Sequence, residues 1–99
     1  MNLVELNLEK IKKLCDNHRV SKLFVFGSVL RDTFNDESDV DLIVDFDDVD
    51  LNQYADNYFD LKQKLEDVFN RSVDLLEEKA IRNPYLRKEI EREKRLIYG

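Results

Sequence analysis

The stretch Phe24-Val25-Phe26-Gly27-Ser28-Val29-Leu30-Arg31, followed by Ser38-Asp39-Val40-Asp41-Leu42-Ile43-Val44-Asp45-Phe46, decides the fold of this chain. An apolar run ends in Gly-Ser, where a helical pattern begins, and a second strand then opens with two aspartates. Because side chains alternate along a strand, Asp39 and Asp41 leave the same face. Two carboxylates on one face repel unless a cation or a proton lies between them, which at neutral pH indicates a divalent metal.

Gly27 and Ser28 are the candidate phosphate contacts. With no Cβ, Gly27 lets a ligand approach the backbone, and the N–H groups and positive dipole of the following helix start suit a phosphate. The carboxylates and the Gly-Ser pair together predict a site for a metal-bound nucleoside triphosphate. Arg31 is either a further contact to the triphosphate or one half of a salt bridge with a nearby acid, and the sequence favours neither interpretation.

The order of these motifs resembles a known family. Gly27-Ser28, ten residues and then Asp39-Val40-Asp41 is similar to the signature of the polymerase-beta-type nucleotidyltransferases, and the short length resembles their minimal members (MNT), often antitoxins paired with a HEPN-domain toxin. The resemblance covers most of the chain, since the acidic strand Ser72-Val73-Asp74-Leu75-Leu76 falls where the family has its third carboxylate. Asp32 stands where the family commonly has Gly.

The resemblance implies a Mg²⁺-dependent transfer of AMP from ATP. It implies two Mg²⁺ ions, or Mn²⁺ in their place, held by three catalytic carboxylates: Asp39, Asp41 and Asp74. It also implies three nucleotide-binding residues: Gly27, Ser28 and Arg31. In the antitoxin branch the acceptor is a tyrosine hydroxyl of the cognate HEPN toxin, so the expected partners are ATP and that toxin, in a hetero-oligomer without direct contact to nucleic acid.

Length and composition limit the other possibilities. Ninety-nine residues predict one domain, 1–99, which is too short for catalytic and acceptor-binding domains side by side. One Cys and one His exclude a disulfide framework and any zinc site built from several Cys and His ligands. The sequence shows no long apolar run and no secretory leader, which predicts a cytoplasmic protein that is not attached to a membrane.

The net charge of −6 is unevenly distributed. Residues 1–78 carry 9 basic and 19 acidic side chains, a balance of −10, whereas residues 79–99 carry 7 basic and 3 acidic side chains, a balance of +4. No Lys or Arg occurs from Asp32 to Leu61, so this surface repels a bare phosphate and general nucleic-acid binding is disfavoured. A solvated acidic loop is the preferred interpretation of four further aspartates: Asp45, Asp47, Asp48 and Asp50.

The predicted fold is α/β (α+β), with a small mixed three-stranded sheet flanked by about four helices. We expect strands over 20–26, 39–46 and 72–76. Helices are expected from an Asn2 cap to near Asn17, from Ser28 to about Phe34, from an Asp50 cap to Asn70, and from Asn83-Pro84 to the end of the chain. The core-facing stripes of the first and third helices comprise Val4, Leu8, Ile11 and Cys15, and Tyr54, Tyr58, Leu61, Leu65 and Val68.

Three features carry a second interpretation. His18, at a helix end, is interpreted as a capping or exposed residue without a chemical role. Asp74 would be costly to bury unpaired, so it shares a metal with Asp39 and Asp41 or forms a buried salt bridge. The last helix, with Leu86, Ile90 and Ile97 in a stripe, is either a solvated helix over the core or a partner surface that includes Leu96-Ile97-Tyr98.

Two other functions are compatible with parts of the sequence. An antitoxin-like binding module would block its toxin by occupancy, with its nucleotide site weakened by Asp32. A small-molecule nucleotidyltransferase would resemble the aminoglycoside-modifying enzymes, but those carry an acceptor domain for which this chain has no room. A Rossmann site, a Walker site and a Ser-His-Asp arrangement are excluded, because the Gly-rich motifs are missing and the one His lies at a helix end.

Overall fold

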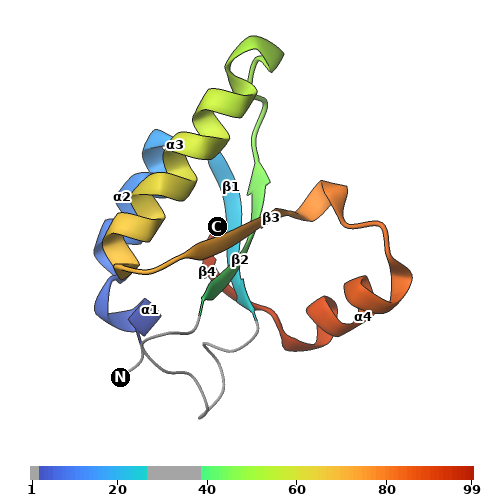
Figure 1. The fold of residues 1–99 in the computed structure, drawn as a ribbon. Coiled ribbons are helices and arrows are strands. Elements are labelled where there is room, and N and C mark those ends of the chain that lie inside the picture. Colours follow the sequence, from blue (N-terminus) through green and yellow to red (C-terminus); the bar gives the residue numbers. More distant parts are fainter. Residues whose placement is uncertain (1–2, 27–38) are drawn as a thin grey trace.

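A computed structural model describes residues 3–26 and 39–99, and in these residues it shows a four-stranded mixed sheet with helices on both faces (Figure 1). Helices α1 (Leu3–Leu6) and α2 (Leu8–Asn17) precede strand β1 (Val20–Phe26). Strand β2 (Val40–Phe46), helix α3 (Leu51–Phe69) and strand β3 (Val73–Glu77) follow. The chain continues through the 3₁₀ helix η2 (Glu78–Ala80), helix α4 (Pro84–Glu93) and strand β4 (Arg95–Tyr98). The predicted fold class is confirmed.

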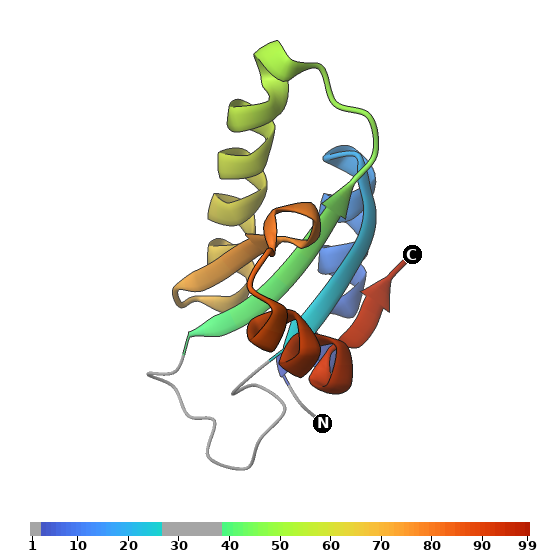
Figure 2. The ribbon, with the colours of Figure 1, turned by 90° about the vertical axis from the view of Figure 1, so that its right-hand side faces the viewer.

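The strands lie in the order β3-β2-β1-β4 across the sheet (Figure 2). Strand β1 is antiparallel to both of its neighbours, β2 and β4, whereas β2 and β3 are parallel. Parallel neighbours need a long crossover connection, and the 19-residue helix α3 provides it. In the described residues β3 and β4 are therefore the two edge strands.

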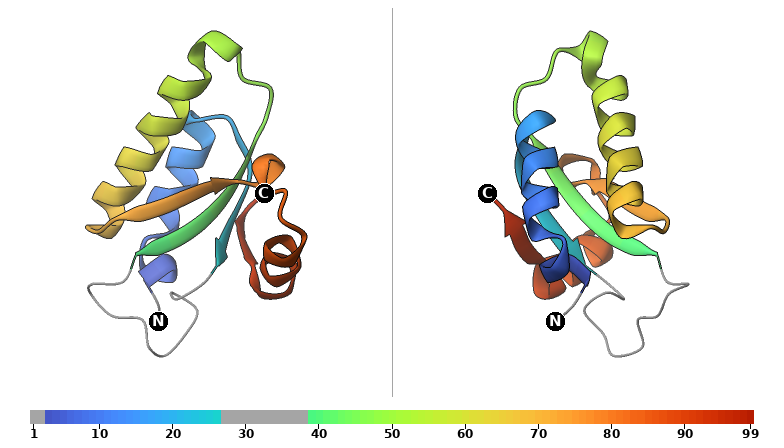
Figure 3. Two further views of the ribbon diagram at one scale, coloured as in Figure 1. Left: turned by 45° about the vertical axis from the view of Figure 1, so that its right-hand side comes forward. Right: turned by 90° about the vertical axis from the view of Figure 1, so that its left-hand side faces the viewer.

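Helices α2 and α3 cover one face of the sheet, and α4 lies on the other (Figure 3). The main core forms between the sheet and helices α2 and α3, because alternate residues of each strand point toward these helices. The predicted stripes are confirmed except at Leu8, which is half-buried and lies outside this core. Ile11, Cys15, Leu61 and Leu65 are fully buried there, and Tyr54 and Tyr58 pack against the same core. On the face toward α4, Ile43 and Ile90 are buried.

The predicted signals at the helix ends that the structure describes are also confirmed. The Asp50 side chain caps α3 by accepting a hydrogen bond from the Asn52 N–H, 3.1 Å away. Asn83 caps α4 by accepting from the N–H groups of Tyr85 and Leu86, at 2.9 and 3.2 Å. Asn70 ends α3 in the left-handed conformation with φ 54°. The proposed Asn2 cap and the helix from Ser28 to Phe34 lie outside the described residues.

The expectation of a helix running to the end of the chain is wrong, and with it the three-strand count. Helix α4 ends at Glu93, and residues 95–98 form β4, which pairs with β1 through Leu23–Tyr98, Phe24–Leu96 and Val25–Arg95. The pairing places two more apolar side chains against the sheet, since Ile97 and Tyr98 pack on the core. The first helix is likewise divided at Asn7, whose side-chain amide donates to the Leu3 carbonyl.

His18 is buried, so the exposed interpretation is wrong, although the residue does bind the end of its helix. Its Nδ1 lies 2.7 Å from the Leu14 carbonyl oxygen of α2, and its Nε2 lies 2.6 Å from the Asp60 carboxylate of α3. Each ring nitrogen of His18 therefore contacts a hydrogen-bond acceptor on a different helix. His18 therefore connects α2 to α3 as a structural residue.

Among the described residues, none of the helices combines the length and the apolar character that crossing a membrane requires.

Candidate active site

Asp41 and Asp74 lie opposite each other in the sheet. They are register partners in the parallel pairing of β2 with β3, so their side chains leave the same face of the sheet on neighbouring strands. Asp41 is half-buried and Asp74 is exposed. The buried salt bridge considered for Asp74 is therefore wrong. The sequence spacing alone did not show that Asp74 would be the direct neighbour of Asp41.

Asp39 stands just before β2, two residues ahead of Asp41, and is exposed. The Asp39 carboxylate therefore belongs to a residue before the strand and not to the part of β2 that pairs with β3. In the described residues, no group of three or more His, Cys, Asp and Glu side chains is arranged so that it could hold a metal ion by itself. The two carboxylates that the register places together are those of Asp41 and Asp74.

The nucleotide-binding candidates Gly27, Ser28 and Arg31 lie outside the described residues, as does Asp32. Phe26 is the last residue of β1, and it is the register partner of Asp41 on the side away from Asp74. Gly27 follows Phe26 in the sequence. Strand β1 therefore ends beside Asp41, immediately before the Gly27-Ser28 pair. Three segments far apart in the sequence thus meet at one end of the sheet: the end of β1, the start of β2 and the start of β3.

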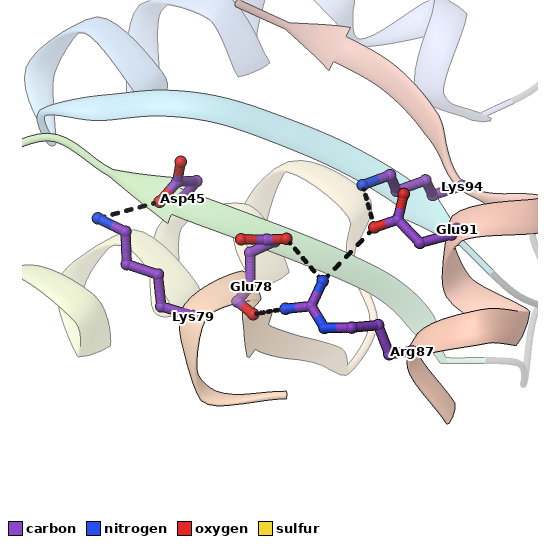
Figure 4. A network of polar contacts seen from close by, with 6 residues as sticks. All are labelled: Asp45, Glu78, Lys79, Arg87, Glu91 and Lys94. Atoms are coloured by element: carbon purple, nitrogen blue, oxygen red, sulfur yellow. Dashed lines mark hydrogen bonds and ion pairs between the residues drawn. The ribbon is translucent and has the colours of Figure 1, made fainter. Parts of the chain in front are cut away.

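Helix α4 lies on the face of the sheet opposite α2 and α3, which is also the face of Asp41 and Asp74. Figure 4 shows the polar contacts that hold it: the Arg87 guanidinium lies 3.0 Å from the Glu78 carboxylate and donates to the Glu78 carbonyl at 2.9 Å. Glu91 lies 3.5 Å from Arg87 and 2.9 Å from Lys94. The Lys94 ammonium also lies 4.2 Å above the centre of the Phe24 ring. These cations of the basic C-terminal region therefore form ion pairs within the chain.

Asp45 differs from the other three residues interpreted as a solvated acidic loop. It lies inside β2, is half-buried, and its Oδ1 is 3.5 Å from the Lys79 Nζ, the contact drawn at the left of Figure 4. The acidic-loop interpretation is therefore wrong for Asp45. Asp47, Asp48 and Asp50 are exposed after the strand, as expected.

Two contacts next to Asp74 were not expected from the sequence. The Glu66 carboxylate of α3 accepts a hydrogen bond from the Val73 N–H at 3.0 Å, and the Tyr58 hydroxyl donates to the Leu75 carbonyl. Burial and, to a smaller extent, the charge of Asp74 raise the pKa of Tyr58. The sequence placed Tyr58 in a core-facing stripe, and the stripe gave no indication that its hydroxyl reaches the strand that carries Asp74.

Comparison with known proteins assigns the chain to a family. The family model described as polymerase beta, nucleotidyltransferase matches residues 9–99. A relative from Methanocaldococcus jannaschii, "Putative protein adenylyltransferase MJ1379", is 38% identical over 92 residues, which cover 92% of this chain and 89% of that protein.

Two solved structures have the same fold. One, "Structure of putative minimal nucleotidyltransferase", is 31% identical with a TM-score of 0.77, over 96% of this chain and 95% of that one. The other, "Crystal structure of the toxin-antitoxin with AMP-PNP", is 25% identical with a TM-score of 0.72, over 94% and 73%. With the family match over residues 9–99, this chain belongs to the polymerase beta nucleotidyltransferase family.

Proposed function

We propose that this chain is a Mg²⁺-dependent protein adenylyltransferase that acts as the antitoxin of a HEPN-type pair. It would transfer AMP from ATP to a tyrosine hydroxyl of its cognate toxin. The observation that carries the proposal is the direct pairing of Asp41 with Asp74 beside the end of β1, in a chain of this family.

The carboxylate pair suits Mg²⁺. Mg²⁺ takes oxygen ligands, and proteins usually hold it through one or two carboxylates together with waters and substrate phosphates, without a complete protein cage. Two facing carboxylates and no preformed group of three in the described residues match that pattern. Asp39, two residues from Asp41, is the further ligand that we assign. The site is then completed when the nucleotide phosphates bind.

Each residue has a separate role in the proposed reaction. Asp39 and Asp41 would hold the metal ions, and Asp74 would be a further ligand that also accepts the proton from the attacking hydroxyl. Gly27 and Ser28 bind the triphosphate through their backbone N–H groups, and Arg31 binds it through its guanidinium. The chemistry that Mg²⁺ supplies when bound is the neutralisation of phosphate charge and the alignment of the attacking and leaving oxygens.

The bonds in this reaction balance without a further reactant. The acceptor hydroxyl oxygen forms a bond to the α-phosphorus of ATP, and the bond from the α-phosphorus to the oxygen that bridges to the β-phosphorus breaks. The hydroxyl proton passes to Asp74 and then to solvent, and pyrophosphate leaves. The product is an acceptor that carries one AMP.

The substrate and the partner are supported by separate observations. The M. jannaschii relative is named as a protein adenylyltransferase, and one solved structure with this fold is a toxin-antitoxin complex that contains AMP-PNP, an analogue of ATP. The residues that the structure describes form a single small layered unit, and among them there is no second unit that could bind an acceptor. An acceptor carried on a partner protein satisfies all three observations.

Radiolabelled ATP tests the reaction class. We expect label from [α-³²P]ATP, but not from [γ-³²P]ATP, to become covalently attached to a HEPN-domain partner in the presence of Mg²⁺. Asp41→Asn should abolish the labelling. Asp47→Asn is the matched control, since Asp47 is an exposed aspartate just beyond the other end of the same strand, and it should label at the normal rate.

Two results would overturn the proposal. Transfer of the γ-label would mean phosphoryl transfer in place of nucleotidyl transfer. No transfer of either label, by a protein that binds and inhibits the same partner, would support the binding module that acts by occupancy.

A further inference from the structure

Strand β3 carries Asp74 at the edge of the sheet. In the described residues it pairs with β2 on one side only, and it is five residues long. A short strand bonded on one side has few hydrogen bonds to fix its backbone. The position of the Asp74 carboxylate therefore depends on whatever else holds this strand.

Helix α3 holds β3 on both sides of Asp74. The residue before it, Val73, donates its N–H to the Glu66 carboxylate at 3.0 Å. The residue after it, Leu75, accepts a hydrogen bond at its carbonyl from the Tyr58 hydroxyl. These two side chains supply hydrogen bonds of the kind that a further strand would make to the backbone of an edge strand.

We propose that Glu66 and Tyr58 are positioning residues. They hold β3 at the residue before Asp74 and at the residue after it, so that the Asp74 carboxylate stays opposite Asp41. This inference rests on the proposed function, because it gives Asp74 a place in the site. Both side chains contact the backbone of β3. Their effect passes through the backbone of Val73 and Leu75.

The helix that carries both residues is firmly anchored. Leu61 and Leu65, which lie between Tyr58 and Glu66 along α3, are fully buried in the core. Each of the two contacts thus connects the edge strand to a packed element and not to a mobile surface. A hydrogen bond between partly buried groups also has few competing waters, so removing one partner leaves the other unsatisfied.

A purely structural role is the competing explanation. It predicts that removing either contact lowers the stability of the fold without a selective effect on Asp74. A catalytic positioning role predicts a change at the site even where the protein remains fully folded. The two explanations separate when the rate, the substrate affinity and the metal affinity are all measured below the melting temperature.

The chain offers matched variants for this test. Tyr58→Phe removes only the hydroxyl. Tyr54→Phe is its control, because Tyr54 lies one turn earlier on α3 and its buried hydroxyl has no hydrogen-bond partner in the described residues. Glu66→Ala removes the acceptor for the Val73 N–H, whereas Glu66→Gln keeps a side-chain carbonyl that can accept the same bond.

We expect Tyr58→Phe and Glu66→Ala each to lower kcat for AMP transfer by about tenfold, with KM for ATP unchanged. Tenfold is the lower end of the range for residues that orient metal ligands indirectly. The affinity for Mn²⁺ with AMP-PNP bound, measured by electron paramagnetic resonance without turnover, should fall to a similar extent. Hydrogen exchange of the β3 amides should become faster. Tyr54→Phe and Glu66→Gln should match the unchanged protein in all three measurements.

Normal kcat and Mn²⁺ affinity in folded Tyr58→Phe and Glu66→Ala would overturn the inference. So would equal losses in Tyr54→Phe. Asp74→Asn distinguishes this outcome from a failure of the proposed function. If Asp74→Asn abolishes transfer while Tyr58→Phe has no effect, only the positioning role is wrong, and if Asp74→Asn transfers AMP normally, the role of Asp74 itself is wrong.

Discussion

Asp41 lies directly opposite Asp74 across the parallel pair of β2 and β3, with both side chains on one face of the sheet. Neighbouring strands are about 4.8 Å apart, and like charges directly opposite each other on a sheet are destabilising. A cation bound between these two carboxylates would offset this unfavourable interaction.

The first prediction concerns metal and stability. Mg²⁺ or Mn²⁺ at millimolar concentration should raise the melting temperature, because a cation between Asp41 and Asp74 removes their repulsion and binds the folded state alone. AMP-PNP added with the metal should raise it further. Differential scanning calorimetry with EDTA as the reference measures both effects. An unchanged midpoint with metal, with and without nucleotide, would show that no metal binds here.

The second prediction separates activity from stability. Asp74→Asn and Asp41→Asn should each abolish AMP transfer, whereas the metal-free Asp74→Asn protein should be as stable as the unchanged protein or more stable, by up to about 1 kcal/mol. Removing one of two facing negative charges is the physical reason. Asp48→Asn, at an exposed residue after β2, is the control and should alter neither property. Unfolding of Asp74→Asn would make Asp74 a structural residue.

The third prediction is a pH dependence that arises far from the site. Hydrogen bonds from His18 and then from Lys64 lower the pKa of the Asp60 carboxyl below its ordinary value of 3.8. A lowered carboxyl pKa stabilises the folded state above pH 3.8, and this contribution is lost as the pH falls through the folded-state pKa.

Melting temperatures of the unchanged protein and of Asp60→Asn test that dependence. Asp60→Asn should melt lower near pH 6, and the difference should shrink as the pH falls below 3.8. Asp56→Asn, at an exposed residue of the same helix, should follow the unchanged protein at every pH. A difference between Asp60→Asn and the unchanged protein that does not vary with pH would contradict the assignment.

The fourth prediction concerns the free thiol. Cys15 is fully buried, and burial, with a smaller contribution from the charge of Asp16, raises its pKa to about 12. The thiolate is the reactive form, so the folded protein should react very slowly with Ellman's reagent at pH 8. Denaturant should make the reaction fast. Rapid reaction of one thiol per chain without denaturant would mean that α2 does not pack on the sheet as described.

Local sequence signals predicted much of this fold. Strand β1 occupies the predicted residues Val20–Phe26, and the caps at Asp50 and Asn83 and the left-handed Asn70 start and end their helices as expected. Each of these signals involves residues within a few positions of one another. Their physical cause is local, so a single sequence contains it.

Strand β4 could not be predicted in the same way. Leu86 and Ile90 continue a helical stripe, but the next positions on that face, Glu93 and Lys94, are charged, and the interruption marked the true helix end. The segment that follows forms a strand because it pairs with the open edge of β1, which lies more than sixty residues away in the sequence. This segment contains Leu96-Ile97-Tyr98. Strand formation depends on such distant partners more than helix formation does.

For the candidate site, too, relations within one element could be predicted and relations between elements could not. Alternation along the strand predicted that Asp39 and Asp41 share one face, and the structure places Asp41 inside β2 and Asp39 just before it. The pairing of Asp41 with Asp74 is a register across two strands joined by a long helix. The contacts of His18 with Asp60 and of Tyr58 with Leu75 depend on how α3 packs. Spacing in the sequence does not encode these relations between elements.

The most direct test of the central claim is the intact mass of a HEPN-domain partner before and after incubation with this protein, ATP and Mg²⁺. Our account predicts a gain of whole AMP units that peptide mapping locates on tyrosine, with no gain in the presence of EDTA or with Asp41→Asn. An unchanged mass in the presence of the wild-type protein, ATP and Mg²⁺, with the two proteins demonstrably bound to each other, would contradict it.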